Sequence, residues 1–288
     1  MTLRTLNEPE PAANPTLARR GFLGGALAAG GFAISVQPVT AQTIATPADG
    51  LVAGMVEVPV GDARIAAYRA HPEGRASAPV VLVVSEIFGV HEHIKDVCRR
   101  LAKEGYYAVA TEFFTRHGDV AKAPDVQSVM KIVAEASDAQ VMKDLDATLA
   151  FAKSEGALTD RLAITGFCWG GRIVWLYAAH NPALKAGVAW YGRVTGPKDD
   201  KRPAHPLDLA DKIKTPILGL YGVKDSGIPI ADVEMLVEDV NKAGGKAELV
   251  AFPEAGHAFH ADYRPSYREK EAKEGWAKML AWFKANGV

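Results

Sequence analysis

The sequence has few cysteines, almost no net charge and no internal repeat, and each of these shortages excludes a class of protein. Two cysteines among 288 residues are too few for the disulfide framework of a small secreted scaffold. A formal net charge of −1 gives no electrostatic reason to expect nucleic acid or an anionic membrane surface as a partner. No repeat with a period of about 20 to 50 residues is visible. The composition, 48% hydrophobic and 23% charged, predicts an ordinary globular protein with a small or neutral substrate.

Of the two cysteines, Cys98 lies in a helical pattern. Ile94, Val97, Cys98 and Leu101 share one face of the segment HIKDVCRRLAKEGY, which predicts a buried core thiol. Pairing with Cys168 remains an alternative, because an oxidising compartment would allow a disulfide.

The N-terminus has the features of an export signal. Arg19 and Arg20 precede an apolar segment over residues 22–36, and the small-residue sequence VTA at 39–41 resembles a cleavage site. The apolar segment is shorter than the roughly 20 residues of a membrane span, so no stable membrane anchor is expected. Paired arginines followed by GFL are typical of the twin-arginine pathway, and a general secretory signal is the alternative.

These features predict three segments: an export signal over residues 1–41, a short linker over 42–53 and one α/β domain over 54–288. The twin-arginine translocation machinery is an expected partner during export. Because either export route leads out of the cytoplasm, the bacterial periplasm or the exterior is the expected location.

From residue 54 onward, short β-rich runs alternate with helical patterns, which is typical of parallel strands joined by crossover helices. The run PVVLVVS at 79–85 is almost entirely apolar, as expected for a strand buried on both faces. An opening hairpin precedes it, and no inserted lid large enough to form a second domain is expected. Later strands are predicted at 106–112, 161–167, 186–190, 215–222 and 247–252.

A candidate nucleophile follows one of these strands. The sequence ITGFCWGG places Cys168 in a strand, G-x-C-x-G turn and helix, which is the nucleophile-elbow arrangement with cysteine in place of serine. Larger side chains at Gly166 and Gly170 would collide with the neighbouring strand or helix. The turn would place the sulfur at a helix N-terminus, where the dipole favours a thiolate. A glycine-rich turn that serves packing alone is the alternative.

A base and its orienting acid follow later strands in the order this arrangement requires. Asp225 comes just after the strand at 215–222, and His257 comes just after the strand at 247–252. The carboxyl ends of parallel strands meet at one edge of the sheet, where Cys168 also emerges. The sequence therefore predicts a Cys-His-Asp triad. Asp225 as a simple turn residue, and another histidine as the base, remain alternatives.

The segment VVSEIFGVHEHI supplies further candidates. Glu86 ends the buried strand at the same edge, and its alternative role is a helix N-terminal acid. The backbone N–H groups of Ile87 and Trp169 are predicted to form the oxyanion hole. The HEH sequence at 91–93 offers no usable ligand set, so no metal site is predicted.

Taken together, EIFG, GFCWGG, the aspartate in GVKDSGIP, and GHAFH resemble the dienelactone hydrolase family over residues 54–286. The resemblance implies a single-domain α/β-hydrolase fold with a mostly parallel sheet of about eight strands. It also implies carboxymethylenebutenolide hydrolysis without a metal or organic cofactor. By the same resemblance, Glu86 would take the proton of Cys168 when substrate binds.

The resemblance also implies residues that bind a substrate carboxylate. Arg116 in EFFTRHG matches one family arginine, whereas the position of the second, four residues beyond the histidine, is Ala261. His260 or Arg264 is expected to supply the missing positive charge, although either could be a solvated loop residue. Tyr191 in AWYGRV resembles a pocket tyrosine of the family, with strand-end packing as its alternative.

The sequence therefore predicts a hydrolase that cleaves an ester or lactone through a cysteine acyl-enzyme. Two alternatives remain: a general carboxylesterase or thioesterase with the same triad, and a non-catalytic binding protein with this fold.

Overall fold

The computed structural model of the protein describes residues 44–288. The predicted export signal lies outside the described residues, so the twin-arginine assignment and the location stay predictions. Of the predicted linker, the last three residues belong to the first strand, which begins at Leu51.

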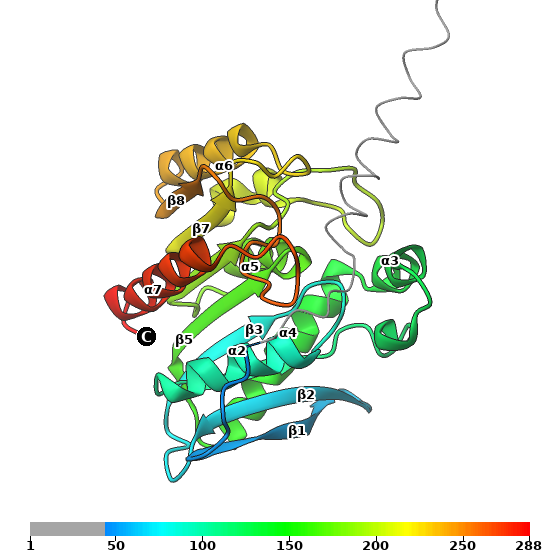
Figure 1. Ribbon diagram of the computed structural model, residues 1–288, viewed down its shortest axis with the longest axis vertical. Coiled ribbons are helices and arrows are strands. Elements are labelled where there is room, and N and C mark those ends of the chain that lie inside the picture. Colours follow the sequence, from blue (N-terminus) through cyan, green and yellow to red (C-terminus); the bar gives the residue numbers. More distant parts are fainter. Residues whose placement is uncertain (1–43) are drawn as a thin grey trace, which may run out of the picture.

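Eight strands form one mixed, mostly parallel sheet in the order β1-β2-β4-β3-β5-β6-β7-β8 (Figure 1). Strands β1 and β2 form the expected antiparallel hairpin, β2 also runs antiparallel to β4, and the remaining neighbours are parallel. This is the α/β-hydrolase fold that the sequence predicts. The strands are β1 (Leu51–Val60), β2 (Ala63–Pro72), β3 (Pro79–Val84), β4 (Tyr107–Thr111), β5 (Leu158–Phe167), β6 (Ala186–Trp190), β7 (Ile217–Gly222) and β8 (Ala247–Phe252).

The burial of strand β3 on both faces of the sheet explains why its sequence is continuously apolar. All six of its residues are buried. Val80 and Leu82 pack into a core on one face of the sheet, and Val81 and Val83 pack into a core on the other. Side chains alternate between the faces of a strand, so a strand covered on both faces needs apolar residues at every position.

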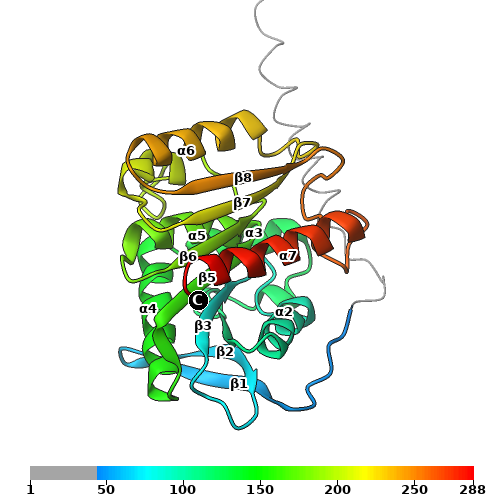
Figure 2. The same cartoon turned by 90° about the vertical axis from the view of Figure 1, so that its left-hand side faces the viewer.

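Helices cover both faces of the sheet (Figure 2). Helices α2 and α7 contribute to the core on one face, while α3, α4, α5 and α6 contribute to the core on the other. Within residues 44–288, no helix is both long enough and apolar enough to cross a membrane. The helices are α2 (Glu92–Lys103), α3 (Val126–Glu135), α4 (Asp138–Ser154), α5 (Trp169–His180), α6 (Ile230–Lys242) and α7 (Glu269–Ala285), with short 3-10 helices at Val120–Lys122 and Pro206–Lys212.

The parallel part of the sheet brings the chemical groups together. Glu86, Cys168, Asp225 and His257 follow strands β3, β5, β7 and β8, respectively. All four therefore lie at the edge formed by the carboxyl ends of these strands, where ligands of α/β sheets bind.

Candidate active site

Cys168 occupies the turn between β5 and α5 in a backbone conformation that is rare for a residue with a side chain. Its φ is 55° and its ψ is −112°. The turn is held by two hydrogen bonds: Cys168 N–H donates to the Trp190 carbonyl at 3.0 Å, and Arg172 N–H donates to the Cys168 carbonyl at 3.3 Å. Such strain persists only where the surrounding structure enforces it, and it concentrates at functional sites.

The two predicted glycines leave room for this turn. A Cβ atom at Gly166 would lie 2.6 Å from the carbonyl carbon of Gly170. A Cβ atom at Gly170 would lie 2.6 Å from the carbonyl oxygen of Ser85 and closer still to that of Val84. The structure confirms the expected collisions with the neighbouring helix and strand.

Replacing Gly170 by alanine is therefore expected to lower the free energy of unfolding by about 1–3 kcal/mol. The added methyl group would clash with the backbone carbonyls of Val84 and Ser85, which cannot rotate away as a flexible side chain could. Urea unfolding followed by far-UV circular dichroism would measure the change. Gly54→Ala is the matched control, since a Cβ atom there would meet nothing within 4 Å. Equal stability of the two variants would show that the elbow tolerates a side chain at position 170.

The three predicted triad residues lie in contact. His257 Nε2 is 3.1 Å from the sulfur of Cys168, and His257 Nδ1 is 2.6 Å from Asp225 Oδ2. The other carboxylate oxygen of Asp225 accepts the N–H of Gly227 at 2.9 Å, which fixes the orientation of the carboxylate. These distances are compatible with the predicted roles of nucleophile, base and orienting acid, which stay predictions.

The environment of His257 favours its charged form. Burial alone would lower the pKa of the imidazole, but the charge of Cys168 and the hydrogen bond to Asp225 outweigh burial and raise the pKa to about 10. At neutral pH the imidazole therefore holds a proton beside the sulfur.

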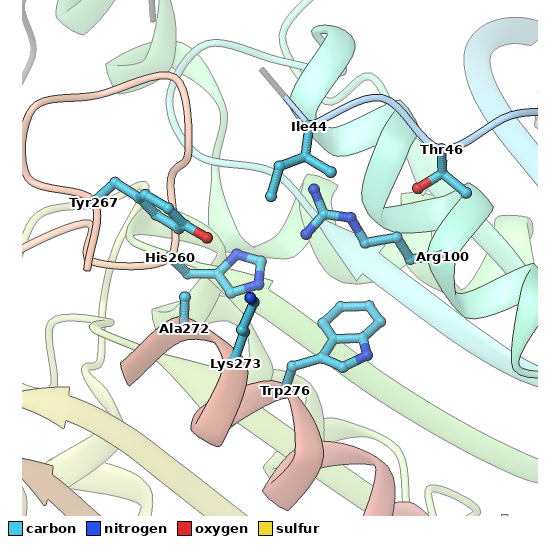
Figure 3. A pocket seen from close by; sticks show the side chains of 8 residues that line it. All are labelled: Ile44, Thr46, Arg100, His260, Tyr267, Ala272, Lys273 and Trp276. Atoms are coloured by element: carbon cyan, nitrogen blue, oxygen red, sulfur yellow. The ribbon is translucent and has the colours of Figure 1, made fainter. Parts of the chain in front are cut away.

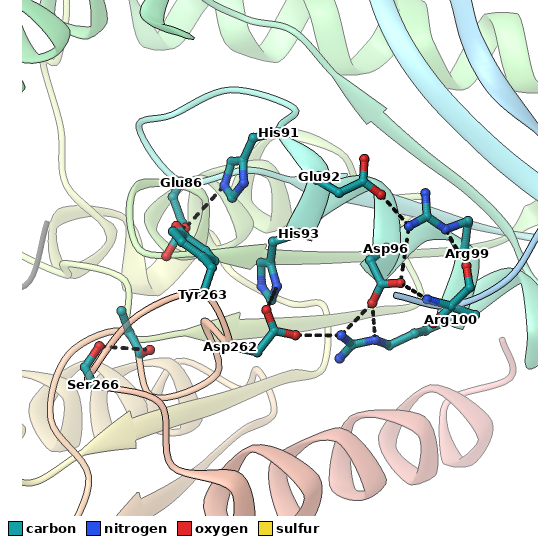
Figure 4. Close-up of polar contacts among 12 residues, drawn as sticks. Glu86, His91, Glu92, His93, Asp96, Arg99, Arg100, Asp262, Tyr263 and Ser266 are labelled. Carbon is teal, nitrogen blue, oxygen red and sulfur yellow. Dashed lines mark hydrogen bonds and ion pairs between the residues drawn. The ribbon is translucent and has the colours of Figure 1, made fainter. Parts of the chain in front are cut away.

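Glu86 lies near this centre but bonds to another group. Its carboxylate is 1% exposed and accepts a hydrogen bond from the Tyr263 hydroxyl, and His91 Nε2 lies 3.7 Å away (Figure 4). Burial would raise the pKa of this carboxyl, but the Arg264 charge and His91 hold it well below its usual range. Among the described residues, the hydrogen-bond partner of the Cys168 sulfur is His257. Proton transfer from Cys168 to Glu86 stays a prediction.

Tyr263 is a site residue that the sequence analysis missed. It is held over Glu86 because the preceding residue, Asp262, is anchored to α2: His93 Nδ1 lies 3.0 Å from one carboxylate oxygen, and Arg100 donates to the other at 2.8 Å (Figure 4). The Tyr263–Glu86 bond joins positions 177 residues apart, so no local spacing could reveal it.

The predicted oxyanion donors lie after strands β5 and β3, at the same edge of the sheet. Trp169 is the first residue of α5, so its N–H has no partner within the helix. Ile87 directly follows Glu86 and is buried. Their joint action on an oxyanion stays a prediction.

Arg116 does not present a free guanidinium. It donates two hydrogen bonds to Asp144 of α4, at 2.6 and 2.9 Å. The Asp144 carboxylate is buried, so this bidentate pair is partly shielded from water. A role in binding a substrate carboxylate would require the pair to open.

His260 lies among aromatic rings. Its buried ring stacks against Phe167 and Trp276 at centroid distances of 5.1 and 5.9 Å. Burial, together with His93 and Arg100, lowers its pKa well below the usual value and keeps the ring neutral. It lines a crevice of about 280 Å³ between α2 and α7 whose lining contains no triad residue (Figure 3).

The remaining two predicted residues lie at the site. Tyr191 has a φ of 39°, and its ring meets the ring of His257 edge-on at 5.3 Å. Arg264 is 4% exposed, and its guanidinium lies over the rings of Phe88 and Tyr263, at 4.9 and 5.1 Å.

Both cysteines are free thiols, which excludes the alternative of a disulfide in this structure. Cys98 is buried in α2, as the helical spacing predicts. Within residues 44–288, no group of three or more histidine, cysteine or acidic residues could hold a metal ion.

Comparison with known proteins places the chain in a family. The model of the "Dienelactone hydrolase family" matches residues 65–287. A protein of Methylorubrum extorquens named "Putative carboxymethylenebutenolidase" is 56% identical over 280 residues, covering 96% of each chain. A protein of the same name from Escherichia coli strain K12 is 49% identical over 259 residues, covering 89% of this chain and 96% of its own.

A solved structure gives the same result. The crystal structure named "Putative Dienelactone Hydrolase" from Klebsiella pneumoniae has 51% sequence identity and a TM-score of 0.79, covering 81% of this chain and 98% of its own. The chain belongs to the dienelactone hydrolase family and is a carboxylic ester hydrolase with the α/β-hydrolase fold.

Proposed function

We propose that the protein hydrolyses an ester or lactone through an acyl-enzyme on Cys168. The observation that carries this proposal is the contact of His257 with both the sulfur, at 3.1 Å, and Asp225, at 2.6 Å, beside a strained turn. The names of the relatives from Methylorubrum extorquens and Escherichia coli support a substrate that resembles a carboxymethylenebutenolide.

In the first half of the reaction, the thiolate of Cys168 attacks the carbonyl carbon. The N–H groups of Trp169 and Ile87 stabilise the resulting oxyanion. As the intermediate collapses, the C–O bond breaks and the His257 imidazolium gives its proton to the leaving oxygen. The product of this half is a thioester on Cys168 and a released or ring-opened alcohol.

In the second half, the neutral His257 takes a proton from water, and the hydroxide attacks the thioester carbonyl. Asp225 stabilises the imidazolium that forms and keeps its orientation. Collapse of the second intermediate releases the carboxylic acid and restores the thiolate–imidazolium pair. Glu86 contributes in the resting enzyme as a negative charge: its Oε2 accepts the Tyr263 hydroxyl, while its buried Oε1 has no hydrogen-bond partner in the described structure.

The test is thiol-sensitive turnover. The protein is incubated with p-nitrophenyl acetate and with carboxymethylenebutenolide, before and after treatment with iodoacetamide. We expect alkylation at Cys168, located by peptide mass spectrometry, to abolish turnover of both. The variant Cys98→Ala is the control and should remain sensitive, because Cys98 is buried in the core. Turnover that survives complete alkylation of Cys168, or no turnover at all, would contradict the proposal.

A further inference from the structure

We propose that Glu112 and Tyr263 are positioning residues that clamp the loop between β3 and α2 and thereby hold the N–H of Ile87 in place for the oxyanion. This inference rests on the proposed function and deepens it, because it names groups that act on the reaction without touching the substrate. The loop, residues 85–91, contains no helix or strand. Its shape therefore depends on the groups that its residues contact.

Glu112 holds the end of the loop that is nearer to α2. Its Oε1 accepts the N–H of Val90 at 2.8 Å. Its Oε2 lies against the preceding residue, since a Cβ atom at Gly89 would be 2.6 Å from that oxygen. Gly89 has a φ of 69°, a left-handed conformation that glycine adopts without strain. Both carboxylate oxygens of Glu112 are therefore in contact with the loop.

The sheet fixes Glu112 itself. Glu112 directly follows β4, and its own N–H donates to the carbonyl of Ala66 in β2 at 2.9 Å. Val90 is 4% exposed, so its N–H would find little water if the carboxylate were removed. A buried donor that loses its acceptor is costly, and we expect the loop to move when Glu112 can no longer accept.

Tyr263 holds the other end of the loop. Its hydroxyl donates to the buried carboxylate of Glu86, the second residue of the loop (Figure 4). The position of Tyr263 is fixed in turn, because the neighbouring Asp262 bonds to His93 and Arg100 of α2. The first residues of the loop and the helix that follows it are thus tied to one pair of adjacent residues.

A third contact lies between these two ends. The guanidinium of Arg264 lies 4.9 Å from the centre of the Phe88 ring. Contacts therefore hold residues 86, 88 and 90, and Ile87 lies between the first two of them with its side chain packed in the core. Within residues 44–288, no acceptor bonds to the Ile87 N–H. The clamp leaves this N–H as a donor for a developing oxyanion.

The clamp matters because an oxyanion donor acts only when it points at the developing charge. Loss of one such donor lowers kcat by about 10²- to 10³-fold, and a displacement of about 1 Å can cost about 10²-fold. The ground-state substrate gains little from the donor. Loosening the loop should therefore lower kcat and leave KM nearly unchanged.

The experiment measures kcat and KM for p-nitrophenyl acetate in four variants. We expect Glu112→Ala to lower kcat by about 10- to 100-fold with KM within about threefold of the wild type. Glu112→Gln should recover most of this loss, because its amide oxygen can accept the N–H of Val90. Tyr263→Phe should lower kcat by about 10-fold. Tyr267→Phe is the matched control, since that tyrosine lies in the same loop as Tyr263 but lines the crevice between α2 and α7.

The rate of Cys168 alkylation by iodoacetamide separates positioning of the oxyanion donor from other effects. In alkylation the sulfur bonds to the CH₂ carbon and iodide leaves, so no oxyanion forms and the Ile87 N–H is not needed. Glu112→Ala and Tyr263→Phe should therefore alkylate within about twofold of the wild-type rate. A parallel fall in alkylation and hydrolysis would overturn the inference, because the two side chains would then act on the thiol or on the fold.

Two other results would also overturn it: an unchanged kcat in Glu112→Ala, or an equal loss in Glu112→Ala and Glu112→Gln. Circular dichroism checks the fold of each variant. Tyr263→Phe keeps the aromatic ring and decides the question by the same two rates if Glu112→Ala does not fold. Wild-type turnover that survives complete alkylation of Cys168 would instead overturn the proposed function.

Discussion

Replacing Cys168 by alanine is expected to lower kcat for ester hydrolysis by about 10⁴- to 10⁶-fold, the range seen when the nucleophile of a triad is removed. The sulfur is the only group bonded to His257 Nε2 in the described structure, so no other side chain can form the acyl-enzyme there. Initial rates with p-nitrophenyl acetate measure the loss, and circular dichroism checks that the fold is kept. Activity within about tenfold of the wild type would refute the nucleophile assignment.

The matched variant Cys168→Ser separates the need for sulfur from the need for any nucleophile at the turn. Serine fits the same space, but its hydroxyl is far harder to ionise than a thiol with an ordinary pKa of about 8.5. In the wild-type site the charge of Cys168 helps to raise the pKa of His257, and a neutral serine hydroxyl would not form that charged pair. We expect Cys168→Ser to lose most activity. Full activity of the serine variant would show that the reaction does not need sulfur at this turn.

Replacing Asp225 by asparagine is expected to lower kcat by about 10²- to 10⁴-fold. The change keeps the shape of the side chain but removes the charge that orients His257 at 2.6 Å. Because a hydrogen bond to the carboxylate favours the charged imidazole, its loss should also lower the pKa of His257 from about 10. The imidazolium protonates the leaving oxygen, so the alkaline limb of the kcat profile should move to lower pH by about 1 to 2 units.

A pH profile of kcat with a neutral ester measures both effects. Glu234→Gln is the control, since it removes one acidic charge from an exposed position on α6 and should leave the profile unchanged. An Asp225→Asn enzyme with normal kcat and an unmoved alkaline limb would mean that Asp225 is only a turn residue.

The fold was predictable because its signals are local. A strand buried on both faces must be apolar throughout, and β3 is. A tight strand-to-helix turn needs small residues, and a Cβ atom at Gly166 or Gly170 would meet backbone. Parallel strands place their carboxyl ends at one edge, so chain order alone was enough to bring Cys168, Asp225 and His257 together.

The surroundings of the triad were not predictable in this way. His260 and Arg264 lie in one loop, and the sequence offers both as a positive charge for the site. In the structure, the His260 ring packs between Phe167 and Trp276. The Arg264 guanidinium instead lies over the ring of Phe88. The direction of each side chain depends on how Asp262 is anchored to α2 by His93 and Arg100. These contacts cross more than 160 positions of sequence, beyond the reach of any periodicity.

The sequence by itself determined the sheet, the elbow and the order of the triad, because these depend on steric demands and periodicity within short segments. The tertiary structure alone decided which charges are already neutralised: Arg116 by Asp144, and the Glu86 carboxylate by Arg264 with a hydrogen bond from Tyr263. The physical reason is that an ion pair depends on distance in space. A formal charge read from the sequence therefore says nothing about whether it remains available to a substrate.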